Sequence, residues 1–157
     1  MISPGSPSGP DSPLVSDVGE RGLIDRIRRR LSPPPSDVIV GIGDDAAVAV
    51  PERGALQVFT TDALVEGIHF DRRFSSIADI GYKALAVNVS DVAAMGGVTR
   101  LALLSLVLPE QTTVVDVDRL LDGLLEMAGY QVHAHLQKLK KEGKVTGKGL
   151  DSTWKPA

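Results

Sequence analysis

Residues 76–97 read Ser-Ile-Ala-Asp-Ile-Gly-Tyr-Lys-Ala-Leu-Ala-Val-Asn-Val-Ser-Asp-Val-Ala-Ala-Met-Gly-Gly, and this stretch decides the fold. Its apolar residues recur at intervals of three and four, which predicts a helix from about Ser76 to Ala94. The paired glycines Gly96 and Gly97 are expected to end that helix. The stripe expected to face the core consists of Ile77, Ile80, Ala84 and Val87.

Asp91 continues the same stripe, one helical turn after Val87. A carboxylate buried there without a partner costs free energy, and a metal ion or a cationic group offsets that cost. A place near the end of the helix would instead put Asp91 at the rim of the core. Both interpretations stay open, and the first makes Asp91 a candidate functional residue.

Short strands are expected on both sides of this helix. They are Val38–Val40, Ala46–Val50 and Leu56–Thr60 before it, and the nearly unbroken apolar run Leu101–Leu108 after it. Such an apolar run is typical of a strand that is buried on both faces. Together with further helices, this order predicts an α+β fold in which helices pack on one face of a mixed sheet.

Two more helices are predicted from capping signals. Asp17 with Glu20 resembles a capping box, and Pro33–Pro35 ends the helix that follows. Thr113 with Asp116 starts the other, and the glycine at 129 fits the position just after its end. Arginines crowd the first of these helices, and we interpret them as a solvated face rather than a nucleic-acid patch, because the protein is acidic. These arginines are Arg26, Arg28, Arg29 and Arg30.

The composition of the 157 residues fits one domain of ordinary size. The hydrophobic fraction is 43%, and the longest apolar stretch is much shorter than a membrane-spanning helix. The N-terminus has no secretory signal pattern, so a cytoplasmic protein is expected. The absence of cysteine excludes disulfides, thiol catalysis and zinc–thiolate sites. The net charge of −3 gives no support for nucleic-acid binding.

The charge changes sign along the chain, and this change defines the expected domains. Residues 1–129 hold 11 basic and 18 acidic residues, a net charge of −7, whereas residues 130–157 hold 6 basic and 2 acidic residues, a net charge of +4. We expect a disordered segment rich in Ser, Pro and Gly at 1–17 and a folded domain at 18–129. We expect a basic helical tail of separate character at 130–157, whose helix ends near Gly143.

Two short motifs carry residues suited to metal and phosphate chemistry. Residues 41–45, Gly-Ile-Gly-Asp-Asp, place carboxylates beside glycines that let the backbone approach a ligand. Mg²⁺ is the natural cation for such oxygen ligands, although a simple turn between strands also fits these residues. Residues 60–62, Thr-Thr-Asp, offer two hydroxyls and a carboxylate for a metal or phosphate, or else form a cap or turn. Together with Asp91 they describe a site that works by positioning and charge neutralisation, so no catalytic residue is assigned.

Three long blocks closely resemble thiamine-monophosphate kinase, in the same order and at its spacing. The blocks are Gly-Ile-Gly-Asp-Asp-Ala-Ala-Val at 41–48, Thr-Thr-Asp-Ala-Leu-Val-Glu-Gly-Ile-His-Phe at 60–70, and the part of the opening stretch from 79 to 97. The resemblance covers roughly Val18–Gly129. It implies the N-terminal domain of that enzyme, which is the N-terminal half of the aminoimidazole ribonucleotide synthetase-like fold.

The resemblance also implies a reaction, in which ATP phosphorylates thiamine monophosphate to thiamine diphosphate. In that scheme Asp45 and Asp91 bind Mg²⁺ ions that bridge the ATP phosphates. Thr60, Thr61 and Asp62 complete the metal shell.

His69 is implied to contact the substrate, and two such domains are implied to pair as a homodimer through their sheets. The resemblance ends near Gly129, where it implies a strand with a Gly-Gly-Asp segment and then a second domain. The sequence has Tyr-Gln-Val-His-Ala-His at 130–135 instead, so we expect an incomplete kinase. The tail faintly resembles the last helix and wing of a winged-helix domain found in some metallo-β-lactamase-like hydrolases. The alternative function is a non-catalytic module that binds magnesium and nucleotide or forms dimers.

Overall fold

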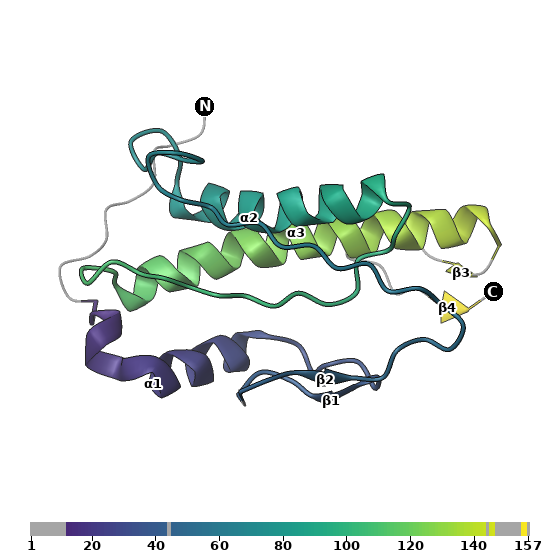
Figure 1. Ribbon diagram of the computed structural model, residues 1–157, viewed down its shortest axis with the longest axis horizontal. Helices are drawn as coiled ribbons and strands as arrows, with labels where there is room; N and C mark the ends of the chain where they lie inside the picture. Colours follow the sequence, from purple (N-terminus) through teal and green to yellow (C-terminus); the bar gives the residue numbers. More distant parts are fainter. Residues whose placement is uncertain (1–11, 44, 144, 147–154, 157) are drawn as a thin grey trace. The chain divides into compact units, whose positions relative to one another are not determined.

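The computed structural model describes residues 12–43, 45–143, 145–146 and 155–156. The described residues form three helices, α1 (Val15–Arg30), α2 (Ile77–Ala94) and α3 (Val114–Lys141), and two short pairs of strands (Figure 1). The strands are β1 (Val38–Val40), β2 (Val48–Ala49), β3 (Val145–Thr146) and β4 (Lys155–Pro156). Of the segment 1–17 predicted to be disordered, residues 1–11 lie outside the described residues, and α1 already begins at Val15.

The chain divides into two compact units. The first combines the chain up to Phe59 with Leu103–Arg119, and the second combines Thr60–Ala102 with the chain from Leu120 onward. Helix α3 contributes its first residues to one unit and the rest to the other.

Helix α1 begins at Val15, about one turn before the start predicted from Asp17 and Glu20. Asp17 lies inside the first turn of the helix and caps it from there. The Asp17 carboxylate accepts a hydrogen bond from the backbone N–H of Leu14 at 2.9 Å. Gly19 then interrupts the helical conformation with φ of 66°, which a residue with a side chain rarely adopts. Leu23 and Ile27 are buried, and the helix ends before the prolines as predicted.

The strands β1 and β2 form an antiparallel pair around the Gly-Ile-Gly-Asp-Asp loop. Val38 lies opposite Ala49 and Val40 opposite Val48. The backbone N–H of Val50 extends the pairing with a bond to the carbonyl of Asp37. This confirms the first two predicted strands, although the second is shorter than expected.

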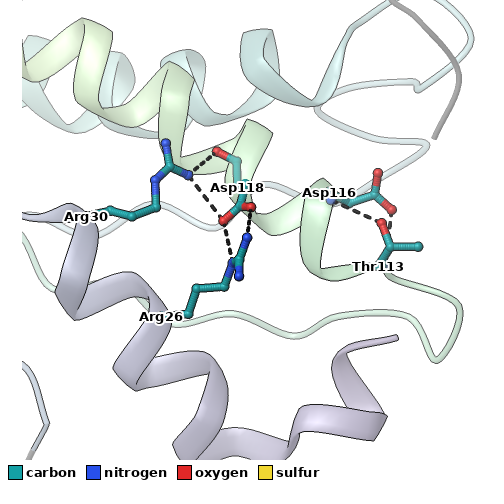
Figure 2. Close-up of polar contacts among 5 residues, drawn as sticks. All are labelled: Arg26, Arg30, Thr113, Asp116 and Asp118. Atoms are coloured by element: carbon teal, nitrogen blue, oxygen red, sulfur yellow. Dashed lines mark hydrogen bonds and ion pairs between the residues drawn. The ribbon is translucent and has the colours of Figure 1, made fainter. Parts of the chain in front are cut away.

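Backbone bonds fasten the start of α1 to the start of α3. Val15 donates to the carbonyl of Thr112 and Val114 donates to the carbonyl of Pro13, both at 2.9 Å. The predicted capping box of α3 is present, since Asp116 N–H donates to the Thr113 hydroxyl and Thr113 N–H donates to the Asp116 carboxylate (Figure 2). Asp116 is buried. The positive end of the helix dipole at the N-terminus of α3 stabilises its negative charge there.

Two arginines of α1 converge on Asp118 in the first turns of α3 (Figure 2). Arg26 makes a two-pronged contact with the carboxylate, with Nε to Oδ1 at 2.9 Å and Nη2 to Oδ2 at 2.5 Å. Arg30 donates to the backbone carbonyl of Asp118 at 2.7 Å and lies 3.4 Å from its carboxylate. The hydrogen bond from Arg26 holds the pKa of Asp118 below its ordinary value, and the charges of Arg26 and Arg30 add to this effect. Arg26, Arg28 and Arg29 are exposed, as the predicted solvated face requires, and Arg26 and Arg30 in addition have a structural role.

Helix α2 is confirmed where the periodicity predicts it. Ser76 caps it, with its hydroxyl accepting from Asp79 N–H while the Asp79 carboxylate accepts from Ser76 N–H. The hydrogen bonds from Ser76 lower the pKa of Asp79. The chain turns away at Gly96, whose φ of 71° suits glycine.

The backbones of α2 and α3 approach closely in the second unit, and glycines make this possible (Figure 1). A Cβ atom added to Gly81 would lie 2.0 Å from the carbonyl oxygen of Leu120. A Cβ atom added to Gly123 would lie 1.8 Å from the carbonyl oxygen of Ala78. Each glycine is thus the residue that allows the facing helix to come near.

The buried face of α2 overlaps the predicted stripe at Ile80, whereas the other three residues of the stripe, Ile77, Ala84 and Val87, are half-buried. Its buried residues are Ile80, Gly81, Val89 and Val92. Asp91 is exposed, so the interpretation as a buried carboxylate is wrong, and the exposure agrees with the alternative, a place at the rim of the core near the end of the helix. The reason is that the close approach at Gly81 turns a different face of the helix inward.

Helix α3 does not end at Gly129, which corrects a predicted boundary. The helix runs without a break to Lys141, and Gly129 has no positive φ. A single glycine costs a helix only about 1 kcal/mol, and the helix-forming residues on both sides outweigh that cost. The predicted end near Gly143 is confirmed, and β3 and β4 then pair antiparallel, with Thr146 opposite Lys155.

Two segments that were predicted to be strands are described by the structure but are not strands. Leu56–Thr60 and Leu101–Leu108 form no strand, and several of their apolar side chains are almost fully exposed. Relative exposure is 97% for Leu56, 87% for Leu103 and 97% for Val107. A strand forms only when a neighbour accepts its hydrogen bonds, and the described residues offer these segments none. The α+β composition holds, whereas the mixed sheet with helices on one face is not confirmed.

Among the described residues, no helix combines the length and the apolar character that crossing a membrane requires.

The helix crossing predicts that replacing different glycines by alanine changes the free energy of unfolding in opposite directions. Gly81→Ala or Gly123→Ala should lower the free energy of unfolding by at least about 2 kcal/mol, because the new methyl group meets backbone atoms. Gly129→Ala, which meets nothing within 4 Å, should instead stabilise the helix by about 0.5–1 kcal/mol. Urea denaturation followed by circular dichroism measures all three variants. Equal effects at the three positions would contradict the close crossing.

The Asp118 contacts predict a pH-dependent contribution to stability. Because folding lowers the pKa of Asp118, its contribution is present above the unfolded pKa of about 3.9 and disappears as the pH falls through the folded value. Asp118→Asn should therefore lower the unfolding free energy at pH 7 by about 0.5–1 kcal/mol, since the contacts are partly exposed. The difference from wild type should shrink below about pH 4. Asp25→Asn, which removes an exposed carboxylate from α1, is the matched control, and a deficit that persists unchanged at low pH would contradict the ion pair.

Candidate functional site

The Gly-Ile-Gly-Asp-Asp loop belongs to the first unit and connects β1 to β2. Gly43 adopts a φ of 118°, a conformation open to glycine and strained for other residues. Asp45 follows it on the surface, and Asp44 lies outside the described residues. The structure thus supports the turn interpretation of the loop while leaving the Asp45 carboxylate exposed.

Two predicted metal-binding residues come together in the second unit. The Thr60 hydroxyl donates a hydrogen bond to Oδ2 of Asp91 at 3.2 Å, across 31 positions of sequence. Both residues are exposed, as are Thr61 and Asp62. Hydroxyl and carboxylate oxygens are hard ligands, so this donor set fits Mg²⁺.

Asn88 lies one turn before Asp91 on α2 and points elsewhere. Its side-chain amide donates to the backbone carbonyl of Ala84 at 2.9 Å. This bond keeps the amide on its own helix and leaves the Asp91 carboxylate to Thr60.

His69 sits in a loop that is held by its own backbone. Val65 donates its N–H to Nδ1 of the His69 ring at 3.1 Å and accepts the N–H of His69 at 2.8 Å. Gly67 donates to the carbonyl of Phe70 at 2.8 Å. Because Nδ1 accepts a hydrogen bond, a neutral ring carries its proton on Nε2, which makes Nε2 the donor available to a ligand.

Lys83 ties the His69 loop to α2, a role that no sequence motif indicated. Its ammonium donates to the backbone carbonyl of His69. The bond joins the loop to the same helix that carries Asp91, so one helix supports two of the predicted site residues.

Asp71 and Arg73 form an ion pair immediately after this loop. The Arg73 guanidinium binds the Asp71 carboxylate through Nε and Nη2, at 2.9 Å and 2.5 Å to Oδ2. The hydrogen bonds from Arg73 lower the pKa of Asp71. The guanidinium also lies 5.3 Å from the ring centre of Phe74. Both side chains of the pair are thereby engaged with each other, which favours a structural role for Arg73.

The described residues contain no group of three or more His, Asp and Glu arranged to hold a metal ion. Asp45 belongs to the first unit, whereas Thr60, Asp62, His69 and Asp91 belong to the second. The structure brings together Thr60 and Asp91, and the full metal site with its substrate-binding histidine stays a prediction.

Comparison with known proteins identifies two regions of the chain. The family described as AIR synthase related protein, N-terminal domain, matches residues 43–134. The Beta-lactamase associated winged helix domain matches residues 120–154. The two matches overlap within α3, and no solved structure matches the chain.

Several curated relatives are named thiamine-monophosphate kinase. The protein from Bacillus subtilis is 46% identical over 93 residues, which are 59% of this chain and 29% of that protein. The protein from Aquifex aeolicus is 44% identical over 110 residues, 70% of this chain and 33% of that protein. The protein from Rhodopirellula baltica is 38% identical over 121 residues, 72% of this chain and 38% of that protein.

The chain spans about a third of the length of these relatives. The matched family region contains the Asp45, Asp62, His69 and Asp91 positions whose geometry is described above. It covers more than half of the 157 residues. The chain therefore belongs to the family of AIR synthase related proteins, of which it carries the N-terminal domain.

Proposed function

We propose that this chain provides the magnesium- and phosphate-binding part of an ATP-dependent kinase that converts thiamine monophosphate to thiamine diphosphate. The observation that carries the proposal is the contact between Thr60 and Asp91, two oxygen-bearing residues that lie far apart in the sequence. The names of the relatives supply the reaction class.

The residues proposed to hold Mg²⁺ are Asp45, Thr60, Thr61, Asp62 and Asp91. The bound ion supplies neutralisation of the charge on the phosphates of ATP. The chain's own contribution is positioning, since the Thr60 hydroxyl fixes one oxygen of Asp91 and leaves the other oxygen open. The carboxylates are exposed, so a hydrated ion reaches them without displacing packed side chains.

His69 is proposed to contact thiamine monophosphate through Nε2. The hydrogen bond from Val65 to Nδ1 sets the orientation of the ring, and Lys83 holds the loop that carries it. A positioned ring donor suits a ligand oxygen, such as one on the phosphate group of the substrate.

The second candidate function is a non-catalytic module that binds magnesium and nucleotide. It is favoured by one observation, the continuation of α3 through residues 130–141, where the resemblance implies a strand with Gly-Gly-Asp. A helix there presents a different backbone from a strand, so the contacts implied for that segment would be missing.

Isothermal titration with Mg²⁺ and ATP tests both candidates on the purified 157-residue protein. We expect binding that requires Mg²⁺ and weakens by about tenfold or more in Asp91→Asn, because a charged ligand becomes neutral while the shape is kept. Glu110→Gln, which removes an exposed carboxylate elsewhere, is the control and should bind like the wild type.

A thiamine diphosphate assay on the same samples separates the two functions. Product formation that depends on Mg²⁺ and Asp91 supports the kinase. Binding without product supports the non-catalytic module, and absence of Mg²⁺-dependent ATP binding overturns both.

We also propose that the chain forms a homodimer through the exposed apolar segment at residues 101–108. Leu103 and Val107 expose most of their side chains to water in the single chain, and burying such groups is favourable. Large exposed apolar surface is typical of regions that bind other proteins.

Light scattering coupled to gel filtration tests the dimer. We expect a mass of about twice 16.6 kDa for the wild type and a monomer for Val107→Asp, because the charge would have to be buried. Ile68→Asp, at another exposed apolar residue, should remain dimeric. A monomeric wild type at tens of micromolar, on the order of common dimer affinities, would contradict the proposal.

A further inference from the structure

The arginine cluster of α1 has two sides with different surroundings. Arg26 and Arg30 are four residues apart, so they share a face of the helix, and both contact Asp118. Arg28 lies two residues from each, about 200° around the helix axis from that face. The geometry of the helix therefore excludes Arg28 from the Asp118 contacts.

Arg28 lies beside the Gly-Ile-Gly-Asp-Asp loop instead. Its Nη1 atom is 3.5 Å from the position that a Cβ atom of Gly43 would occupy. Both residues belong to the first unit, so this contact does not depend on the placement of the second. Among the ion pairs that join described residues, none involves Arg28.

A guanidinium next to a glycine-rich turn is suited to phosphate. Glycines leave backbone N–H groups open to an anion, and the planar guanidinium binds two phosphate oxygens at once. The exposed Asp45 in the same loop repels an approaching phosphate, and a positive charge beside the loop offsets this repulsion.

We propose that Arg28 is a phosphate-binding residue, whose guanidinium donates hydrogen bonds to a polyphosphate held at the turn around Gly43. The proposal rests on the proposed function, since the polyphosphate is that of the nucleotide. It adds a cationic group from α1 to the loop that carries Asp45, within the first unit. It also gives Arg28 a role different from that of Arg26 and Arg30.

Arg29 offers a matched control. It is the next residue on α1, carries the same charge and is exposed. A general loss of positive charge would therefore affect Arg28→Gln and Arg29→Gln equally, whereas a specific contact would affect only the first. Arg28→Lys keeps the charge and loses the fork, so it should recover part of the binding.

Isothermal titration with inorganic tripolyphosphate tests the proposal, first in EDTA and then with Mg²⁺. We expect Arg28→Gln to bind about tenfold more weakly than the wild type and Arg29→Gln to differ by less than about twofold. Thermal melts of each variant should match the wild type, because both side chains are exposed.

The outcomes separate this inference from the proposed function. If Arg28→Gln binds tripolyphosphate as tightly as the wild type while Asp91→Asn loses binding, the role of Arg28 is overturned. The kinase proposal then still stands. An equal loss in the Arg28 and Arg29 variants also overturns it, since bulk charge then explains the binding. No binding of tripolyphosphate or of ATP with Mg²⁺ by the wild type overturns both proposals.

Discussion

The crossing of α2 and α3 at Gly81 and Gly123 is the constraint on which the second unit depends. Neither helix has room for a single methyl group at this point, so the two glycines fix both the separation and the rotation of α2. The rotation decides which residues face water. It turns Asp91 outward to the Thr60 hydroxyl and leaves Lys83 free to reach the His69 loop. The exposure of Asp91 thus follows from a packing requirement elsewhere on the same helix.

Local signals in the sequence were sufficient to predict much of the helical structure. The Thr113–Asp116 capping box, the end of α2 at Gly96 and the end of α1 at the prolines depend on neighbouring residues alone, and all are observed. The boundary at Gly129 failed because a glycine weakens a helix without forbidding it. Local reasoning works where the competing structures differ in the conformation of a few residues.

Features that depend on distant partners were harder to predict. The segment Leu101–Leu108 has the composition of a buried strand, but composition does not provide the neighbour that a strand needs. Of the stripe containing Asp91, Ile80 is buried, whereas Asp91 itself is exposed, because the close approach at Gly81 shifts the buried face of the helix. The roles of Lys83 and Arg28 had no sequence signal, because each follows from a contact with a loop more than ten residues away. The sequence predicted that Thr60 and Asp91 belong to the same site, but it did not predict the hydrogen bond between them.

Helix α3 belongs to both compact units, and this has a consequence for how the protein unfolds. Asp118, which binds the arginines of α1, and Gly123, which allows the approach of α2, are separated by only about 7.5 Å along the helix axis. A helix that frays through this short interval releases both sets of contacts together. The interval of α3 between Asp118 and Gly123 is therefore the part of the helix on which the contacts of both residues depend.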